Sequence, residues 1–401
     1  MLRGGTRVKV CILTPEFLPT WGGIGTYAYN LARGLQARAE VHVLAGSTGP
    51  ECAGLDGVEV HTVYPFDGHP RASSPFRFQT AVFRQLPRLA RDHGFDLLHA
   101  NHAYMSDLLL RLRRSRWPTV VTVHTTLDSQ VRGTLRAGRH APRRGLERTL
   151  ARWRFPLEAI ERRYLRRTRA MIFVSDWLRN RTIQRYRVNP RLSAVVPNAI
   201  DTQGLSPGLA PRDSEGPATS RPTILFAGRL LALKGIDTLL RAMTRVDRVV
   251  QIRLAGPGDQ RPWRALARTL GLPADRCEFL GRVPYFKMPA LYRAVDAVVL
   301  PSFTESCPLV ALEAMACGTP LIAADSGGVS EIVRDGETGW LFPPGDVDAL
   351  VALIGQVLSD SARARQVGVR ARAWIEANAT IDRMADRTFE VYEQVLEGEA
   401  A

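Results

Sequence analysis

Residues 297–323, AVVLPSFTESCPLVALEAMACGTPLIA, contain the clearest strand–loop–helix–strand pattern in the chain. The apolar runs 297–300 and 320–323 are short and bounded by Pro and Gly, which is typical of buried strands. Between them, residues 309–316 form an apolar and alanine-rich segment that favours a helix. A strand, a helix and a second strand in this order predict two neighbouring parallel strands joined by a crossover helix.

The same alternation extends along most of the 401 residues and predicts an α/β fold. It is interrupted once, at 201–222, by a segment rich in Gly, Pro and Ser that we interpret as a linker. We therefore expect two doubly wound, Rossmann-like domains, at 1–200 and 223–380, with a crevice between them and a last helix at about 381–401 that packs back on the first domain. Strands are expected at 8–14, 40–45, 58–63, 97–100, 119–124, 170–175, 194–197, 223–227, 250–255, 277–280, 297–300 and 320–323.

The composition excludes several classes of protein. Apolar residues make up 45% and charged residues 23%, which is ordinary for a globular protein and excludes wholesale disorder. No apolar run is long enough to span a membrane, and the apolar stretch 8–13 is predicted to be a strand and not a signal peptide. The five cysteines include no C-x-x-C pair, which argues against a zinc site or a disulfide framework and favours a reducing cytoplasm.

The positive charge is concentrated in the first half of the chain. Residues 1–198 contain 32 Arg and Lys against 14 Asp and Glu, a balance of +18, whereas residues 199–401 have a balance of −3. The first half is therefore expected to lie near negative charge. Two segments, 71–91 and 143–169, have the pattern of basic amphipathic helices, which either lie on an anionic membrane or bury their apolar stripes in the core.

Two glutamates lie on either side of the predicted start of the helix at 309. Glu305 precedes the helix and Glu313 lies about one turn inside it. The free N–H groups of a helix N-terminus bind phosphate, and flanking carboxylates suit a ligand with hydroxyls at both ends of a diphosphate. The alternative is a capping glutamate and an ordinary helix glutamate.

Two cations follow the strand at 223–227. Arg229 and Lys234 lie on the loop that leads to the next helix, where they are placed to clamp an anion. Lysine occurs at only three positions, 9, 234 and 287, so its presence in this loop favours a specific role.

These motifs resemble those of the retaining glycosyltransferases of the GT-B fold in glycosyltransferase family 4. The resemblance extends to about residue 346 and rests on the glycine loop 22–25, His124, the segments 196–201 and 228–235, the Gly-Pro-Gly at 256–258, residues 279–281 and the Glu-x7-Glu of 305–313. It implies an enzyme, a hexosyltransferase, that moves a sugar from a nucleoside diphosphate sugar to an acceptor hydroxyl and forms an α-glycosidic bond. Such an enzyme would act in the biosynthesis of cell-envelope glycans or glycolipids, or of small natural products.

The resemblance also implies roles for individual residues. The cations Arg229 and Lys234 would neutralise the diphosphate, Glu305 would bind the transferred sugar, Glu313 would bind the ribose, and His124 would lie near the reacting sugar. The catalytic set is therefore His124, Arg229, Lys234 and Glu305, and the donor-binding set is Gly22, Gly23, Arg229, Lys234, Arg282, Val283, Glu305, Leu309, Val310 and Glu313. From spacing alone, a structural histidine at a strand end is an equal alternative for position 124.

We predict no cofactor and no metal, because the two cations can do what a metal does elsewhere. The acidic pair at 346 and 348 follows Pro-Pro-Gly, so Asp346 is interpreted as a helix N-cap. The protein is expected in the cytoplasm, either free or bound peripherally to the inner face of the membrane. Its expected partners are a nucleotide sugar and an anionic acceptor. The alternatives are a sugar-nucleotide epimerase of similar fold and a basic protein that binds an anionic surface or nucleic acid without sequence specificity.

Overall fold

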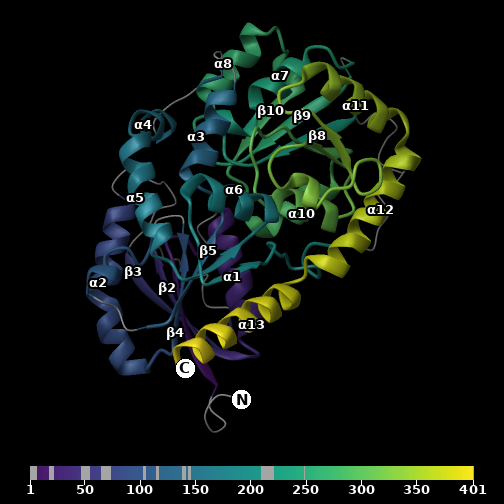
Figure 1. The fold of residues 1–401 in the computed structure, drawn as a ribbon. Helices are drawn as coiled ribbons and strands as arrows, with labels where there is room; N and C mark the ends of the chain where they lie inside the picture. Colours follow the sequence, from purple (N-terminus) through teal and green to yellow (C-terminus); the bar gives the residue numbers. More distant parts are fainter. Residues whose placement is uncertain are drawn as a thin grey trace. The chain divides into compact units, whose positions relative to one another are not determined.

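In a computed structural model the chain forms two compact units, each built on its own sheet (Figure 1). Unit 1 comprises Met1–Leu127, Trp153–Ala199 and Ile381–Ala401, and unit 2 comprises Asp128–Arg152 and Ile200–Thr380. The segment Asp128–Arg152, which the predicted division assigns to the first domain, thus belongs to unit 2. The structure describes residues 7–17, 22–46, 55–64, 74–102, 105–113, 117–137, 141–142, 146–208, 221–247 and 249–400, so most of the predicted linker lies outside the described residues.

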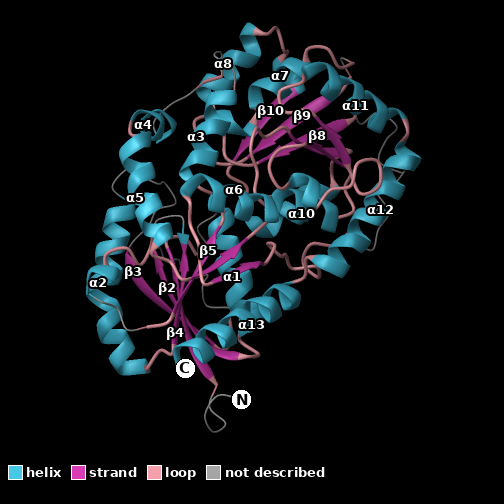
Figure 2. Cartoon of the chain, viewed as in Figure 1, coloured by secondary structure: helices cyan, strands magenta, loops and turns pink. Residues whose placement is uncertain are grey.

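The described part of unit 1 contains a seven-stranded parallel sheet in the order β3-β2-β1-β4-β5-β6-β7. Figure 2 draws the strands in magenta. The strands of this sheet are β1 (Val8–Thr14), β2 (Ala39–Gly46), β3 (Val58–Tyr64), β4 (Leu97–Asn101), β5 (Thr119–Val123), β6 (Ala170–Phe173) and β7 (Leu192–Val195). Its helices are α1 (Gly23–Leu35), α2 (Ser74–His93), α5 (Arg154–Arg166), α6 (Asp176–Tyr186) and α13 (Ile381–Ala400). Strand order reverses between β1 and β4, which is the switch point where doubly wound sheets bind ligands.

Alternation along the strands sends side chains to two covered faces. Val10 and Ile12 of β1 pack with Val41 and Val43 of β2 against α1 and α13. The terminal helix α13, yellow in Figure 1, lies beside α1. The intervening residues, such as His42, point to the opposite face, because successive side chains of a strand alternate. The helix α2 packs against β3.

The described part of unit 2 contains a six-stranded parallel sheet in the order β10-β9-β8-β11-β12-β13. Its strands are β8 (Thr223–Ala227), β9 (Gln251–Ala255), β10 (Cys277–Gly281), β11 (Ala297–Leu300), β12 (Leu321–Ala324) and β13 (Trp340–Phe342). Its helices are α7 (Ile236–Met243), α8 (Arg261–Thr269), α9 (Met288–Arg293), α10 (Leu309–Ala316), α11 (Val347–Ser359) and α12 (Ser361–Asn378), together with α4 (Leu146–Arg152) and all but the first residue of α3 (Leu127–Arg136). The order reverses between β8 and β11, so the loops that carry Lys234 and Glu305 flank the switch point.

The sequence-based assignments differ from the structure in a few places. The segment 143–169, expected to form a basic amphipathic helix, contains two helices, α4 and α5, on either side of Trp153. β13 and α12 were not predicted. Asp346 caps α11 as expected, because its carboxylate accepts the amide of Ala349 at 3.0 Å.

The two basic amphipathic segments differ in how their apolar side chains are used. In α2, Phe78, Val82 and Leu86 are buried, whereas Phe76 is exposed, and residues 71–73 of this segment lie outside the described residues. At α5, Trp153, Phe155 and Ile160 are exposed while Tyr164 is buried. Among the described residues, none of the helices has the length and apolarity to cross a membrane. Association with an anionic membrane surface stays a prediction.

Glycine is required where loops of unit 2 touch. Gly235 has φ +69°, and a Cβ there would lie 1.9 Å from the carbonyl oxygen of Pro301, whereas Gly271 has a similar φ of +74° with open space around its Cβ position. A side chain in this left-handed region costs about 1–2 kcal/mol, and a clash with backbone adds roughly 1–3 kcal/mol by analogy with overpacking.

We therefore expect Gly235→Ala to destabilise unit 2 more than its matched control Gly271→Ala. The measurement is urea unfolding followed by circular dichroism, with the midpoints of both variants compared with the wild type. Equal losses of stability in the two variants would show that the contact with Pro301 is not a constraint.

Candidate active site

Two loops meet at the carboxyl edge of the second sheet, one after β8 and one after β11. The amide of Phe303 donates to the carbonyl of Leu233 at 2.9 Å, next to the close approach of Gly235 to Pro301. This pairing brings the ammonium of Lys234 within 2.6 Å of Glu305 Oε1. Their side chains are 23% and 10% exposed, so the ion pair is largely shielded from water. The structure thus brings together two residues that were predicted from separate motifs.

The backbone of Glu305 is held by a third loop, which follows β12. The amide of Gly328 donates to the carbonyl of Glu305 at 2.9 Å. Gly327 has φ +70°, and a Cβ there would lie 1.8 Å from the same oxygen. Glu305 is therefore fixed by backbone contacts and not only by its side chain.

Unpaired hydrogen-bond donors lie on the same two loops. The exposed guanidinium of Arg229, on the β8 loop, has no ion pair or hydrogen bond with any described residue. The amides of Leu309 and Val310, in the first turn of α10, likewise donate to no atom of the described chain. An N-terminal turn with free amides beside two cations attracts anions through its partial positive charge.

Glu313 lies one turn into α10 and is almost completely buried. The hydroxyl of Tyr292, at the end of α9, donates to its Oε2 at 2.6 Å. Burial raises the pKa of Glu313 to about 7, and the hydrogen bond from Tyr292 offsets part of this rise. Near neutral pH this carboxyl group therefore exists in both protonation states, and a ligand hydroxyl that donates to it favours the ionised form.

Arg282 and Val283 follow β10 at the same edge of the sheet. The amide of Gly256 donates to the carbonyl of Gly281 at 2.7 Å, and the amide of Gly228 donates to that of Ala255 at 2.9 Å. Backbone hydrogen bonds thus connect the loop after β8 to that after β9, and the loop after β9 to that after β10. Arg282 is exposed and Val283 is half-buried.

The predicted site residues of unit 1 lie after β1 and β5. Gly22 precedes α1 and Gly23 is its first residue; a Cβ at Gly22 would lie 2.0 Å from the carboxylate of Glu16. His124 Nε2 is hydrogen-bonded to Asn101 Oδ1 at 3.1 Å, and its ring packs edge-on against Tyr27. Burial, with His99 and His102 nearby, lowers the pKa of His124 to about 3, so its imidazole is neutral.

Several positioning residues were not selected from the sequence. Glu147 of α4 accepts the amide of Ala232 at 3.0 Å, and a Cβ at Gly133 of α3 would meet Thr304 at 2.4 Å. The segment Asp128–Arg152 thus packs against the loops that carry Lys234 and Glu305. The glycine pair 327–328 after a strand is a sequence signal that could have marked this loop as part of the site. Tyr292 and Glu147 carry no such signal, because their partners are distant in sequence.

A cavity of about 670 Å³ in unit 1 lies away from these residues. It borders Thr119, Ala170 and Leu192, at the starts of three strands. None of the predicted site residues lines it. We therefore place the candidate site from the residue chemistry of the strand carboxyl ends and not from this cavity.

Comparisons with known proteins agree with this fold. Residues 210–374 match the family described as Glycosyl transferases group 1, and residues 21–203 match Glycosyltransferase Family 4. The chain is 31% identical over 377 residues to a D-inositol 3-phosphate glycosyltransferase of Nocardia farcinica, covering 88% of this chain and 80% of the relative. A protein of the same name from Mycobacterium marinum is 32% identical, with 90% and 78% covered.

Solved structures share the fold at lower identity. Sucrose-phosphate synthase from Thermosynechococcus elongatus superposes with a TM-score of 0.80 at 23% identity, covering 98% of this chain and 100% of that one. Anabaena Alr3699/HepE, in complex with UDP-glucose, gives a TM-score of 0.74 at 22% identity, with 97% and 100% covered.

The raised pKa of Glu313 predicts how stability depends on pH. Between its ordinary value of 4.5 and about 7, the folded chain keeps a proton at Glu313 that the unfolded chain has released. The contribution of Glu313 to the free energy of unfolding therefore falls as pH rises through this window. For a pKa shift of this size the fall is at most about 3 kcal/mol.

Glu313→Gln removes this titration, so we expect its stability relative to the wild type to increase from pH 5 to pH 8. Urea unfolding at several pH values measures the difference. The control Glu337→Gln, at a carboxyl group that is 65% exposed, should show a constant difference. A pH-independent difference for Glu313→Gln would contradict the raised pKa.

Proposed function

This chain belongs to glycosyltransferase family 4, and we propose that it is a retaining enzyme that moves a sugar from a nucleoside diphosphate sugar to an acceptor hydroxyl, forming an α-glycosidic bond. The observation that carries the proposal is the pairing of Lys234 with Glu305 at 2.6 Å, next to the unpaired Arg229 and the free amides of α10. A diphosphate with a hydroxyl-bearing group at each end matches this arrangement of charges.

The diphosphate is assigned to the positive part of the site. Arg229 and Lys234 provide two cations, and the amides of Leu309 and Val310 provide donors that the described chain leaves unused. As the bond to the sugar breaks, negative charge grows on the departing phosphate, and donors fixed in advance stabilise that charge. We therefore propose that these groups make a divalent metal unnecessary for the transfer.

The two glutamates are assigned to the ends of the donor. Glu305, held through its carbonyl by Gly328, would accept hydroxyls of the transferred sugar. Glu313, oriented by Tyr292, would accept the ribose hydroxyls. Arg282 and Val283 would border the base. Gly22, Gly23 and His124 stay proposals for the groups of unit 1 that contact the reacting sugar and the acceptor.

We propose a same-face route for the reaction. The bond between the anomeric carbon and the phosphate oxygen breaks first, with the charge of the leaving group compensated by Arg229 and Lys234. The departing phosphate oxygen then takes the proton of the acceptor hydroxyl, whose oxygen bonds to the same face of the sugar. The neutral His124 can accept a hydrogen bond from a sugar hydroxyl but does not act as a general acid near neutral pH.

Nucleotide binding tests the donor assignment. We expect UDP, ADP or GDP, titrated calorimetrically with EDTA present, to bind the wild type, with UDP the first candidate because a solved neighbour holds UDP-glucose. Arg229→Gln should weaken binding by about ten- to a hundredfold, which corresponds to the loss of a hydrogen bond from a charged group. The control Arg253→Gln alters an arginine paired with Glu278 and should bind as the wild type does. Unchanged binding by Arg229→Gln would contradict the proposal.

The acceptor is proposed to be anionic, with a phosphorylated cyclitol as the leading candidate. Residues 111–191 contain 22 basic and 5 acidic side chains, and the relatives from Nocardia farcinica and Mycobacterium marinum are named D-inositol 3-phosphate glycosyltransferases. Such an acceptor suits either setting predicted from the sequence, a cell-envelope glycolipid or a small natural product.

Product analysis tests the acceptor and the stereochemistry together. With the nucleotide sugar selected by the binding experiment, we expect transfer to inositol 3-phosphate but far less to inositol, and a KM for the phosphorylated acceptor that rises with salt because screening weakens its attraction. Proton NMR of the product should show the α anomer. Equal use of the two acceptors would contradict an anionic acceptor, and a β product would contradict retention.

A further inference from the structure

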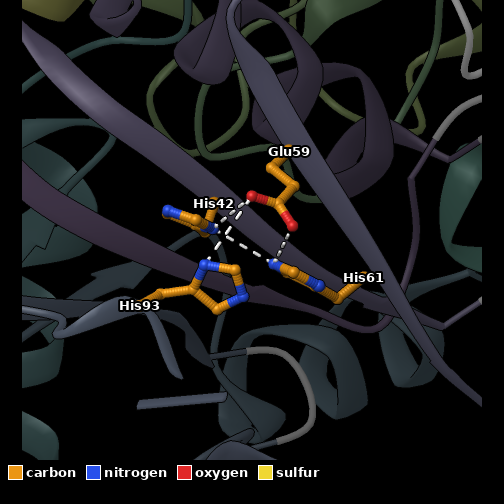
Figure 3. A group of neighbouring side chains, drawn as sticks. All are labelled: His42, Glu59, His61 and His93. Carbon is orange, nitrogen blue, oxygen red and sulfur yellow. Dashed lines mark hydrogen bonds and ion pairs between the residues drawn. The ribbon is translucent and has the colours of Figure 1, made fainter. Parts of the chain in front are cut away.

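Three histidines and a glutamate of unit 1 point toward one another (Figure 3). His42 lies on β2, Glu59 and His61 lie on β3, and His93 is the last residue of α2. One ligand atom from each residue lies within 4.8 Å of each of the others. No residue of this cluster has a role in the sequence analysis or in the proposed reaction.

The sheet register explains why the four residues meet. His42 is the partner of Glu59 in the parallel pairing of β2 with β3. Glu59 and His61 are two apart and share one face of the edge strand β3. The helix α2 runs back over this region and ends with His93 just before β4. The histidines thus come from three elements. A ligand bound by all three would connect the edge of the sheet to its covering helix.

The distances in the cluster are close to those of a tetrahedral site. His42 Nδ1 lies 3.1 Å from His61 Nε2 and 3.4 Å from Glu59 Oε2. His61 Nε2 lies 3.6 Å from Glu59 Oε1, and His93 Nδ1 lies 3.8 Å from Glu59 Oε2. Zinc bonds of about 2.0–2.1 Å in a tetrahedron separate their ligand atoms by about 3.3 Å. Only small movements of the more exposed Glu59 and His93 would complete this geometry.

The surroundings of His42 orient its ring toward the centre of the cluster. Its other nitrogen, Nε2, lies 3.1 Å from Glu40 Oε1 and donates to that carboxylate in the neutral ring. The lone pair on Nδ1 then points at Glu59 and His61. Phe95 packs against the rings of both His42 and His93. A carboxylate on the far nitrogen of a ligating histidine is a regular feature of metal sites, where it fixes the tautomer and ring orientation.

We propose that His42, Glu59, His61 and His93 bind a divalent transition metal, with Zn²⁺ as the ion that best suits three imidazoles and one carboxylate. Four protein ligands leave no open position for water or substrate, so the site is structural and not catalytic. It lies before the carboxyl ends of β2 and β3, whereas Gly22 and His124 follow the carboxyl ends of β1 and β5. The metal would tie β2, β3 and α2 together.

The proposal departs from the prediction of no metal, which rested on the cysteine pattern and on the two cations of the proposed reaction. The absence of a C-x-x-C pair argues against zinc held by cysteines, but it does not bear on a site made of imidazoles. The metal-independence proposed for sugar transfer concerns Arg229 and Lys234 in unit 2. Loss of the metal site would leave the nucleotide-binding proposal untouched, and the two proposals fail by different measurements.

Zinc binding to the full chain, without a polyhistidine tag and after dialysis against EDTA, tests the proposal. ZnCl₂ is titrated in competition with a chromophoric chelator, and the metal retained after desalting is counted by mass spectrometry. We expect one zinc per chain and a higher melting temperature on its addition. CoCl₂ in place of zinc should give the intense visible absorption of a tetrahedral site.

Matched variants locate the metal. Glu59→Gln and His93→Gln, which change exposed or half-buried ligands, should weaken zinc binding by at least about tenfold. Glu40→Gln, which changes the hydrogen-bond partner of the ligand His42, should weaken it by about tenfold. The control Glu278→Gln alters a strand glutamate of similar exposure, 58% against 54% for Glu59, and should bind zinc as the wild type does. A wild type that retains no zinc, or one whose zinc binding is unchanged in both Glu59→Gln and His93→Gln, would overturn the proposal.

Discussion

The close approach of backbone segments at the carboxyl edge of the second sheet is the constraint on which the candidate site depends. A Cβ at Gly256 would lie 1.8 Å from the carbonyl oxygen of Gly228, one at Gly235 would lie 1.9 Å from that of Pro301, and one at Gly327 would lie 1.8 Å from that of Glu305. Loops after β8, β9, β11 and β12 can come this close only where no side chain intervenes.

This packing fixes charges that flexible loops would not hold. Lys234 follows Leu233, whose carbonyl is bound by Phe303, and it therefore faces Glu305. In the proposed donor complex, the diphosphate shares Lys234 with Glu305, and Arg229 adds a second cation. A preformed arrangement of donors needs little reorganisation as charge moves to the leaving group, which is the physical basis of rate enhancement by such sites.

Local sequence signals predicted most of the fold and singled out the charged residues of the proposed site. Short apolar runs marked all but one of the strands. The strand order of the structure, with β8 beside β11, then places Lys234 and Glu305 on neighbouring loops. The helix α12 was missed because its face against the core consists of a few residues, such as Val367 and Ile375, within an arginine-rich segment. The role of Tyr292 and the four-residue cluster around His42 depend on contacts between distant segments, which local periodicity does not encode.

The most direct test of the proposed donor site is NMR of the lysine ammonium groups, because the chain contains only three lysines. In ¹⁵N-lysine-labelled protein, with signals assigned by arginine substitution at Lys9 and Lys287, we expect saturating UDP to shift the Lys234 ammonium signal and to leave that of Lys9 in place. Bound UDP with an unmoved Lys234 signal would contradict the claim that this lysine contacts the donor diphosphate.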